Sequence, residues 1–370
     1  MQIAITKKLA AAIGIKPAST SEPTNPLFCW TANWTNTFDR RKEDMVVMVN
    51  HATRFTVIIF GVKRNHFKDI AAKMTAAIRN TLLALNVNSE IVEEYMRLSG
   101  EILFTANHDR KLTAWVNWQG LDAAFVVGRA VNGREGEIKY VDTLGNFVSD
   151  RIVNCGKSAE EAFVPRRKML AALSEATGKP AFRYRAFELL VTLDLDIYKA
   201  VRRLIVPADI TLSQLHQVLQ EVFHWKNYHL YDYTVFAGKS RKPVIRLVES
   251  VEDLEYDKDA ILMTGRKLSE YMPLNKRIFY TYDLGDNWEH EIKFLREIAE
   301  HNEESPYLLE AIGQTPPEDV GGVGGYCEFR EIMLDPNHPE HAGTKEWAGY
   351  WSLELREWEK RPRVIKPGFR

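Results

Sequence analysis

The stretch from Phe279 to Phe294, FYTYDLGDNWEHEIKF, constrains the fold of this chain more than any other. Apolar and polar side chains alternate on both sides of a short polar turn, Asp283 to Asn287, which contains a glycine. This alternation is the period of a half-buried strand, and the turn composition is typical of a β-hairpin. The sequence therefore predicts a hairpin whose return strand has a core face made of Trp288, His290, Ile292 and Phe294.

Length and composition indicate a globular protein of two or three domains. The chain has 370 residues, of which 45% are hydrophobic and 27% charged. Lys and Arg (49) nearly balance Asp and Glu (50), so nucleic-acid binding would need a local basic patch. The three cysteines form no CxxC pair, which fits reduced thiols and argues against a zinc ribbon. With no signal-peptide pattern and no apolar run of roughly 18 residues, we expect a cytoplasmic protein without a membrane partner.

The first third of the chain predicts an N-terminal α+β domain over residues 1–122. Its β-branched runs predict strands, and apolar residues at helical spacing predict helices, with Ser89 as an N-cap. We expect strands at 2–6, 45–50, 55–60, 101–106 and 111–117, and helices at 7–13, 66–85 and 89–97. Residues 123–180 are expected to connect the domains and to contain one helix, at 158–177.

A second α+β domain is expected over residues 181–370. A helix at 212–223 begins after Thr211, a plausible N-cap, and the central hairpin follows it. We expect strands at 184–195, 229–236 and 244–247, and a short helical turn at 267–271. Each domain is expected to be a mainly antiparallel sheet with packed helices.

Three blocks in the second domain resemble the Ri-plasmid ORF-3-like family, a passenger of insertion elements that is also labelled TnpR-like. They read IVPADITLSQLHQVLQEVFHWKNYHLYDYTV, FYTYDLGDNWEHEI and TPPEDVGGVGGY, and they occur in this order. The chain departs from the family where a Trp-Arg-Arg is usual, because Val201 precedes Arg202 and Arg203. The resemblance implies an α+β fold and a mobile-element setting, and it implies no catalytic residues.

The N-terminal part resembles a domain of unknown function. The resemblance lies in LFCWTANW, the cluster Arg40-Arg41-Lys42, VNHATRFTVIIFG and GEILFTANHDRKLTAWVN. It implies an α+β fold for this part as well, and no biochemical activity.

Polar side chains around the hairpin turn form a candidate metal or catalytic site. Carboxylates and an imidazole that converge on one cleft bind Mg²⁺ or Mn²⁺ and activate water in metal-dependent nucleases. In the alternative interpretation, the aspartates cap the turn through their own backbone and the histidine is a hydrogen-bonded core residue. The candidates are Asp283, Asp286, His290, Glu318 and Asp319, with His216 or His229 as further ligands.

A candidate binding cleft lies between the hairpin, the Gly-rich stretch 315–326 and the end of the helix at 212–223. Glycines let a backbone approach a ligand closely, so this stretch could contact a bound anion. The alternative, which we expect, is a structural loop folded over the hairpin. Aromatic and basic residues nearby would suit base stacking or phosphate contacts, with core packing as the alternative. The candidate binding residues are Trp225, His229, Tyr282, Trp288, Gly322, Gly325, Tyr326, Arg202 and Arg203.

These observations favour a binding module of mobile-element or host-defence type that recognises a protein or a nucleic acid. The alternative is a metal-dependent phosphodiesterase or nuclease that uses the Asp/His/Glu cluster. If oxygens of at least three of the candidate carboxylates lie within about 5 Å of one point, the metal site becomes credible.

Overall fold

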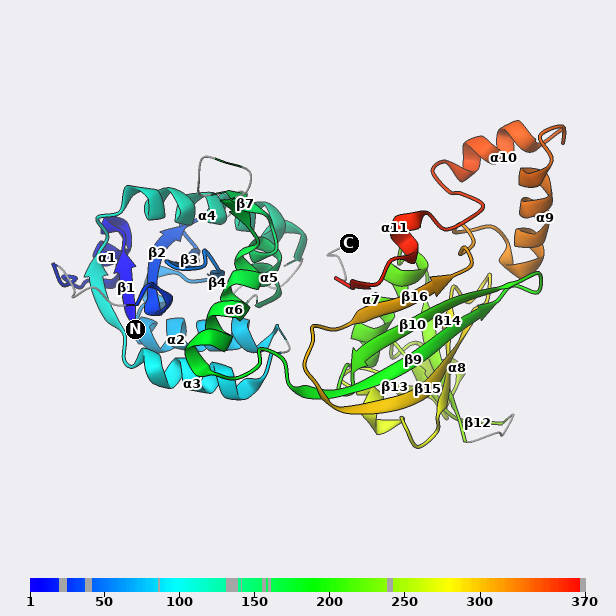
Figure 1. Ribbon diagram of the computed structural model, residues 1–370, viewed down its shortest axis with the longest axis horizontal. Coiled ribbons are helices and arrows are strands. Elements are labelled where there is room, and N and C mark those ends of the chain that lie inside the picture. The colour runs from blue at the N-terminus through cyan, green and yellow to red at the C-terminus, as the bar shows by residue number, and fades with distance from the viewer. Residues whose placement is uncertain are drawn as a thin grey trace. The chain divides into compact units, whose positions relative to one another are not determined.

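The structure is a computed structural model that describes residues 1–19, 25–36, 42–85, 87–130, 139–140, 142–154, 158, 161–237 and 242–366. The chain forms two compact units (Figure 1), an N-terminal unit, Met1–Arg183, and a C-terminal unit, Tyr184–Arg370. Arg40 and Arg41 of the basic cluster lie outside the described residues. Within the described residues, no helix combines the length and the apolar character that a membrane span requires.

A mixed sheet forms the centre of the N-terminal unit. Among the described residues its strand order is β5-β1-β2-β3-β4-β6, with β1 parallel to both β2 and β5 and the other pairs antiparallel. The strands are β1 (Gln2–Ile5), β2 (Cys29–Thr35), β3 (Met45–Asn50), β4 (Thr56–Phe60), β5 (Leu103–Ala106) and β6 (Lys139–Tyr140), with a separate pair β7 (Val153–Asn154) and β8 (Ala162–Phe163).

Helices pack on this sheet and on one another. α4 contacts β2 and β3, α5 contacts β4, and α6 contacts α3 and α5, so the described part of residues 123–180 packs within the N-terminal unit. The helices are α1 (Lys7–Ile13), α2 (Ile70–Leu83), α3 (Ser89–Ser99), α4 (Arg110–Ala130), α5 (Asp142–Ser149) and α6 (Pro165–Thr177), with 3₁₀ turns η1 (Pro26–Phe28) and η2 (Arg64–His66).

The prediction of a strand at 111–117 is wrong, because these residues open helix α4. Oδ1 of Asp109 accepts hydrogen bonds from the backbone N–H groups of Lys111 and Leu112, at 2.7 and 3.1 Å. Leu112, Val116 and Ala123 then recur at helical spacing and are buried. The short run that predicted a strand did not show this longer helical spacing, which the packing of α4 on β2 and β3 uses.

Two predicted helix starts have different outcomes. Thr211 caps α7 (Leu212–Phe223) as predicted: its Oγ1 accepts from Gln214 N at 3.2 Å, and Gln214 Oε1 accepts from Thr211 N at 3.0 Å. At α3 the cap is Asn88, whose Oδ1 accepts from Glu90 N at 3.1 Å, and Ser89 is already the first helical residue. Both residue types are favourable N-caps, so composition could not separate the two neighbours.

The C-terminal unit is built on a second sheet. Among the described residues its order is β13-β12-β11-β14-β15-β9-β10-β16-β17, and every neighbouring pair except β12–β13 is antiparallel. The strands are β9 (Tyr184–Asp194), β10 (Lys199–Pro207), β11 (Tyr231–Phe236), β12 (Pro243–Val248), β13 (Ile261–Leu262), β14 (Arg277–Tyr282), β15 (Trp288–His301), β16 (Tyr307–Ile312) and β17 (Arg363–Val364). The two α+β folds, dominated by antiparallel pairs, are confirmed.

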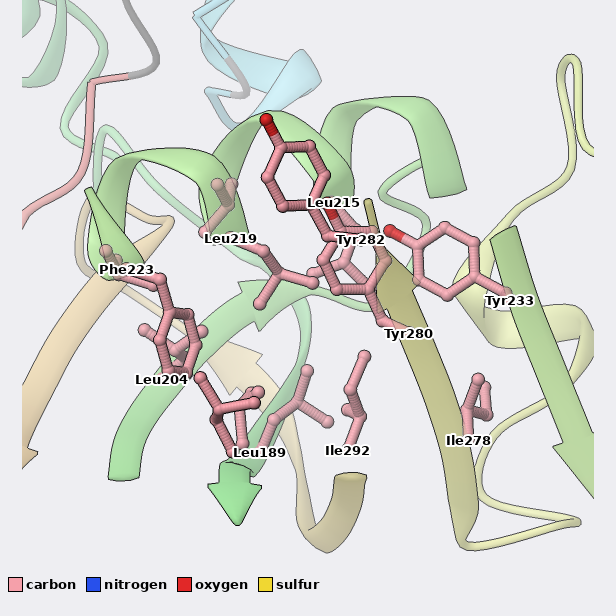
Figure 2. Close-up of a cluster of buried hydrophobic side chains, with 14 of the residues drawn as sticks. Leu189, Leu204, Leu215, Leu219, Phe223, Tyr233, Ile278, Tyr280, Tyr282 and Ile292 are labelled. Carbon is pink, nitrogen blue, oxygen red and sulfur yellow. The ribbon is translucent and has the colours of Figure 1, made fainter. Parts of the chain in front are cut away.

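Helix α7 covers one face of this sheet. Figure 2 shows Leu215, Leu219 and Phe223 of α7 pointing toward Leu189 and Ile292 of the strands, and all of them are buried. The other helical elements of the unit are α8 (Asp253–Tyr256), η4 (Leu268–Glu270), α9 (Gly322–Leu334), α10 (His341–Ala348) and α11 (Glu357–Lys360).

The central hairpin is confirmed as the pair β14–β15, in which Tyr280 lies opposite His290 and Tyr282 opposite Trp288. Three of the four residues predicted for the core face of β15 are buried, namely Trp288, His290 and Ile292, and Phe294 is half-buried, whereas Glu289 is exposed. This hairpin is central in the sheet, since β11 pairs with β14 and β9 pairs with β15.

The Gly-rich stretch was predicted to be a loop, and this is wrong for its second half. Helix α9 begins at Gly322, after Gly321 has turned the chain with a left-handed φ of 91°. Tyr326, Phe329 and Ile332 lie on the buried face of this helix. Glycines lower helix propensity, and here the apolar face outweighs that preference by packing on the core.

Candidate functional site

Three segments of the C-terminal unit meet at the turn end of the central hairpin. His229 comes from the connection between α7 and β11, Asp283 from the β14–β15 turn, and Asp319 from the segment before α9. One ligand atom from each lies within 4.8 Å of the others. Glu318 adjoins them, and we call His229, Asp283, Glu318 and Asp319 the hairpin-end cluster.

The imidazole of His229 lies at the centre of this cluster. Its Nε2 is 2.9 Å from Asp319 Oδ1, 3.5 Å from Asp283 Oδ2 and 3.8 Å from Glu318 Oε2. Nε2 is buried and makes no hydrogen bond of good geometry within the described residues, despite these short distances. Three candidate carboxylates therefore have an oxygen within 5 Å of one point.

The connection that carries His229 is held by several hydrogen bonds. Asn227 N donates to Gln220 Oε1 at 2.8 Å, and Asn227 Oδ1 lies 2.8 Å from Nε2 of His216. Tyr228 N donates to the Tyr282 hydroxyl at 3.0 Å. These bonds tie the segment to α7 on one side and to β14 on the other, so the position of His229 is set by the fold.

Asp283 is oriented by its own turn. It has a left-handed φ of 55°, and its Oδ1 accepts from Gly285 N and Asp286 N at 3.0 and 3.3 Å. Its backbone N–H donates to Leu230 O at 3.0 Å. Oδ1 therefore caps the turn as predicted, while Oδ2 faces His229. The same carboxylate can both cap the turn and act as a metal ligand.

Glu318 lies deepest in the cluster, with only 4% of its side chain exposed. Its Oε1 accepts from the backbone N–H of Lys226 and, at 3.2 Å, from the Tyr282 hydroxyl. Burial raises the pKa of the Glu318 carboxyl, and the nearby charge of Asp319 acts in the same direction. A cation placed among these oxygens would reverse that effect.

Exposure increases from Glu318 outward across the cluster. The exposed fraction of the side chain is 10% for Asp283, 28% for His229 and 63% for Asp319. Within the described residues, all ion pairs of the three carboxylates are made to His229. The cluster is thus an acidic group that opens to solvent on the side of Asp319.

The spacing of these atoms suits a single divalent ion. Metal–ligand bonds of about 2.0–2.2 Å at roughly 90–109° place two ligands of one ion about 3.0–3.5 Å apart. The distances from His229 Nε2 to Asp319 and Asp283 are close to this range. Imidazole nitrogen with carboxylate oxygen is a donor set for ions such as Mn²⁺ or Zn²⁺, and carboxylates also suit Mg²⁺.

Asp286 and the glycines connect the hairpin turn to α9. Asp286 Oδ2 accepts from Gly321 N at 3.1 Å, so this carboxylate binds the Gly-rich segment, and among the described residues it makes no ion pair with His229. A Cβ on Gly322 would lie 2.9 Å from Asp286 O, and one on Gly325 would overlap Val320 O. Gly322 therefore allows a close approach of the hairpin turn, and Gly325 a close approach of the chain just before α9, which are structural roles.

His290 lies in the core and outside the cluster. It is fully buried; its Nε2 accepts from Trp225 Nε1 at 3.2 Å and its Nδ1 lies 2.9 Å from Trp288 O. His216 is likewise buried, with Nδ1 2.7 Å from the Tyr280 hydroxyl. Burial lowers the pKa of each of these histidines to about 4, so both are neutral at pH 7.

Most of the aromatic binding candidates are core residues. Trp225 and Trp288 are fully buried, with ring centroids 5.7 Å apart, and Tyr326 is fully buried against Phe329. Tyr282 is also buried, but its hydroxyl contacts Glu318 and so belongs to the wall of the cluster. Core packing, the alternative stated from the sequence, describes the first three.

The two candidate arginines differ although they are neighbours. Arg202 is fully buried, and its guanidinium donates to the carbonyls of Val222, Val201, Ile312 and Gly313 and to the Thr315 hydroxyl, at 2.7–3.2 Å. Burial lowers its pKa to about 10. Arg203 is 44% exposed and pairs with Glu188. Neither is part of the hairpin-end cluster.

The sequence indicated Asp283, Glu318 and Asp319 as candidate metal or catalytic residues, and it gave His229 only as an alternative further ligand. A clearer signal was present in the turn-forming residues around His229, because a polar segment between a helix and a strand often carries function. Sequence reasoning also missed the Tyr282–Glu318 contact, since its members are far apart in the chain.

Comparison with known families agrees with both resemblances. The model of the plasmid pRiA4b ORF-3-like proteins matches residues 185–360, and the model of the domain of unknown function DUF6933 matches residues 2–168. Through its C-terminal unit, the chain belongs to the plasmid pRiA4b ORF-3-like family.

Two individual proteins are each similar to a little less than half of this chain. The uncharacterized protein y4hQ of Sinorhizobium fredii is 40% identical over 173 residues, which are 44% of this chain and 79% of that protein. The crystal structure of MM3350, a protein of unknown function from Methanosarcina mazei, is 28% identical with a TM-score of 0.42, covering 48% of this chain and 97% of that chain. These names state no activity.

Proposed function

We propose that the C-terminal unit binds a divalent metal ion, Mn²⁺ or Mg²⁺, at the hairpin-end cluster and uses it to recognise a phosphate-containing ligand. The observation that supports this is the position of His229 Nε2, which faces oxygens of Asp319, Asp283 and Glu318 at 2.9–3.8 Å. A group of three carboxylates and one imidazole, in which Asp283 and Glu318 are nearly buried, carries excess negative charge, and a bound cation would compensate it.

The main competing arrangement has no metal. In it a protonated His229 is the cation of the cluster, and the group only ties three segments of the fold together. The two arrangements differ in one measurable property, because only the first requires a divalent ion. A mobile-element setting stays a prediction.

Calorimetric titration of Mn²⁺ into the full chain tests the proposal. We expect one site in the wild type and at least about a hundredfold weaker binding in Asp283→Asn/Asp319→Asn, since two of the charged ligands are lost. The control Asp209→Asn/Glu270→Gln removes two acidic charges at the other end of α7, where both residues contact Lys267. Absence of Mn²⁺ binding in the wild type, or equal binding by both variants, would contradict the proposal.

A second candidate function is hydrolysis of a phosphodiester. It is favoured by the 63% exposure of the Asp319 side chain, which leaves the solvent side of a bound ion open to water. A metal-activated water would attack phosphorus, its proton would pass to a carboxylate, and the P–O bond to the leaving oxygen would break. Mn²⁺-dependent release of nitrophenolate from bis(4-nitrophenyl) phosphate tests this, and metal binding without release limits the unit to recognition.

A further inference from the structure

Three large apolar side chains lie exposed next to the hairpin-end cluster. The exposed fractions of Tyr228, Leu230 and Leu284 are 71%, 55% and 44%. Tyr228 and Leu230 flank His229 in the chain, and Leu284 follows Asp283. Because Asp283 N donates to Leu230 O at 3.0 Å, the two segments adjoin. We call these three residues the apolar rim; grouped exposed apolar side chains mark interaction sites.

The ring of Tyr228 remains outside the core although its aromatic neighbours in the chain are inside. Trp225, Tyr231 and Tyr233 are 0–5% exposed and belong to the core of the unit. The backbone N–H of Tyr228 is held by the hydroxyl of Tyr282, which also donates to Glu318. An exposed ring on a fixed backbone is a platform with little conformational freedom to lose on binding.

A cation accompanies this platform. Nζ of Lys226 lies 5.8 Å from the centroid of the Tyr228 ring, and the backbone N–H of the same lysine donates to Glu318. The ring, the lysine and His229 therefore belong to one continuous segment, 226–229, which adjoins the hairpin turn that carries Asp283. A ligand that covers the ring brings its neighbouring groups within reach of the cluster.

We propose that the apolar rim and the hairpin-end cluster together bind single-stranded nucleic acid, with a base stacked on Tyr228 and the adjacent phosphate held by Lys226 and the metal ion. This inference rests on the proposed metal site. Every base offers an aromatic face, and single-stranded sites combine such stacking with cations that contact the backbone.

Charge and shape select this ligand over others. Without a metal, the three carboxylates of the cluster repel a phosphate, so binding should require the divalent ion. A duplex keeps its base faces stacked and inaccessible to Tyr228, so a single strand should bind better than a duplex. An apolar peptide would use the rim but would have no need of the ion.

Fluorescence anisotropy with a labelled oligothymidylate and Mn²⁺ tests the inference. We expect binding that chelation abolishes, and about tenfold weaker binding in Tyr228→Ala, which corresponds to the loss of one stacked base. Tyr228→Phe keeps the ring and should bind like the wild type. The control Tyr350→Ala removes a tyrosine that is 96% exposed elsewhere in the same unit, and it should change nothing.

The possible results separate this inference from the proposed function. Calorimetric Mn²⁺ binding by the wild type and by Tyr228→Ala, without any oligothymidylate binding, overturns the nucleic-acid inference and leaves the metal site intact. Oligothymidylate binding that persists after chelation overturns the part assigned to the metal. Equal affinity of Tyr228→Ala and wild type, or of single strand and duplex, overturns the stacking.

Discussion

Two nearly buried glutamates of the C-terminal unit lie in opposite electrostatic surroundings. Glu188 in β9 is 1% exposed, and its two oxygens accept from Nε of Arg203 and Nε of Arg296, both at 2.6 Å. Burial raises the pKa of Glu188, but these two cations outweigh it and leave the pKa below the usual value. The side chain of Glu318 is 4% exposed and adjoins two further carboxylates, and its pKa is raised.

The two surroundings differ in charge balance: cationic side chains compensate Glu188, whereas carboxylates outnumber cationic side chains in the hairpin-end cluster. At Glu188 the protein itself supplies two positive charges to one carboxylate. At Glu318, Asp283 and Asp319 it supplies one histidine to three carboxylates among the described residues. Buried charge that the protein leaves uncompensated is costly for stability, which is why such clusters are characteristic of ligand sites.

The largest effect is expected where the interior loses a buried hydrogen-bond donor. Arg202→Met should lower the free energy of unfolding by about 4 kcal/mol, because the carbonyls that Arg202 satisfies would remain buried without donors. Urea unfolding measures the loss. Arg203→Met, at the neighbouring and half-exposed position, should cost about 1 kcal/mol, and equal costs for the two variants would contradict the assignment of Arg202 to the interior.

The interior histidines should make the C-terminal unit sensitive to acid. The pKa of each histidine is about 4 in the folded protein and 6.5 in the unfolded chain. Their contribution to the free energy of unfolding is therefore complete above pH 6.5 and is lost as pH falls toward 4. When the pH is lowered from 7 to about 5, the free energy of unfolding should fall by about 2 kcal/mol for each of His216 and His290. Unfolding at both pH values and ring titration by NMR test this; titration of either ring near 6.5 would contradict it.

The two glutamates should respond to neutralisation with opposite signs. In the absence of metal, Glu188→Gln should destabilise the protein by about 2 kcal/mol, since an amide N–H₂ group would face an arginine donor. Glu318→Gln should stabilise it by about 1 kcal/mol, because it removes a like charge and keeps the oxygen that Lys226 N uses. Destabilisation by both substitutions would show that Glu318, like Glu188, is stabilised by its surroundings as a carboxylate.

Stabilisation by the metal ion is expected to be of similarly small size. At a Mn²⁺ concentration ten times the dissociation constant, the wild type should gain about 1.4 kcal/mol. Glu188→Gln should gain the same amount from its lower starting point, whereas Asp283→Asn/Asp319→Asn should gain nothing. Thermal unfolding with Mn²⁺ and with a chelator measures the difference, and an equal gain in all three proteins would show that Mn²⁺ acts elsewhere.

Elements with a long local pattern could be predicted from the sequence, and others could not. The β14–β15 hairpin and helix α7 carry strict alternation or helical spacing together with turn and cap residues, so local physics was sufficient for them. α4 and the first turn of α9 were missed, because their burial against other elements outweighs a misleading local composition.

The candidate site likewise contains residues that local sequence predicts and residues that only the tertiary structure brings together. Asp283 was predictable because a hairpin turn favours aspartate, and the same sequence placed Trp288 and His290 on the core face. Which carboxylates would meet His229 depended on how the α7–β11 connection and the segment before α9 reach the hairpin turn. Those approaches arise from strand pairing and packing between distant parts of the chain, and so the tertiary structure alone decided that Glu318 and Asp319 join the cluster while Asp286 binds Gly321.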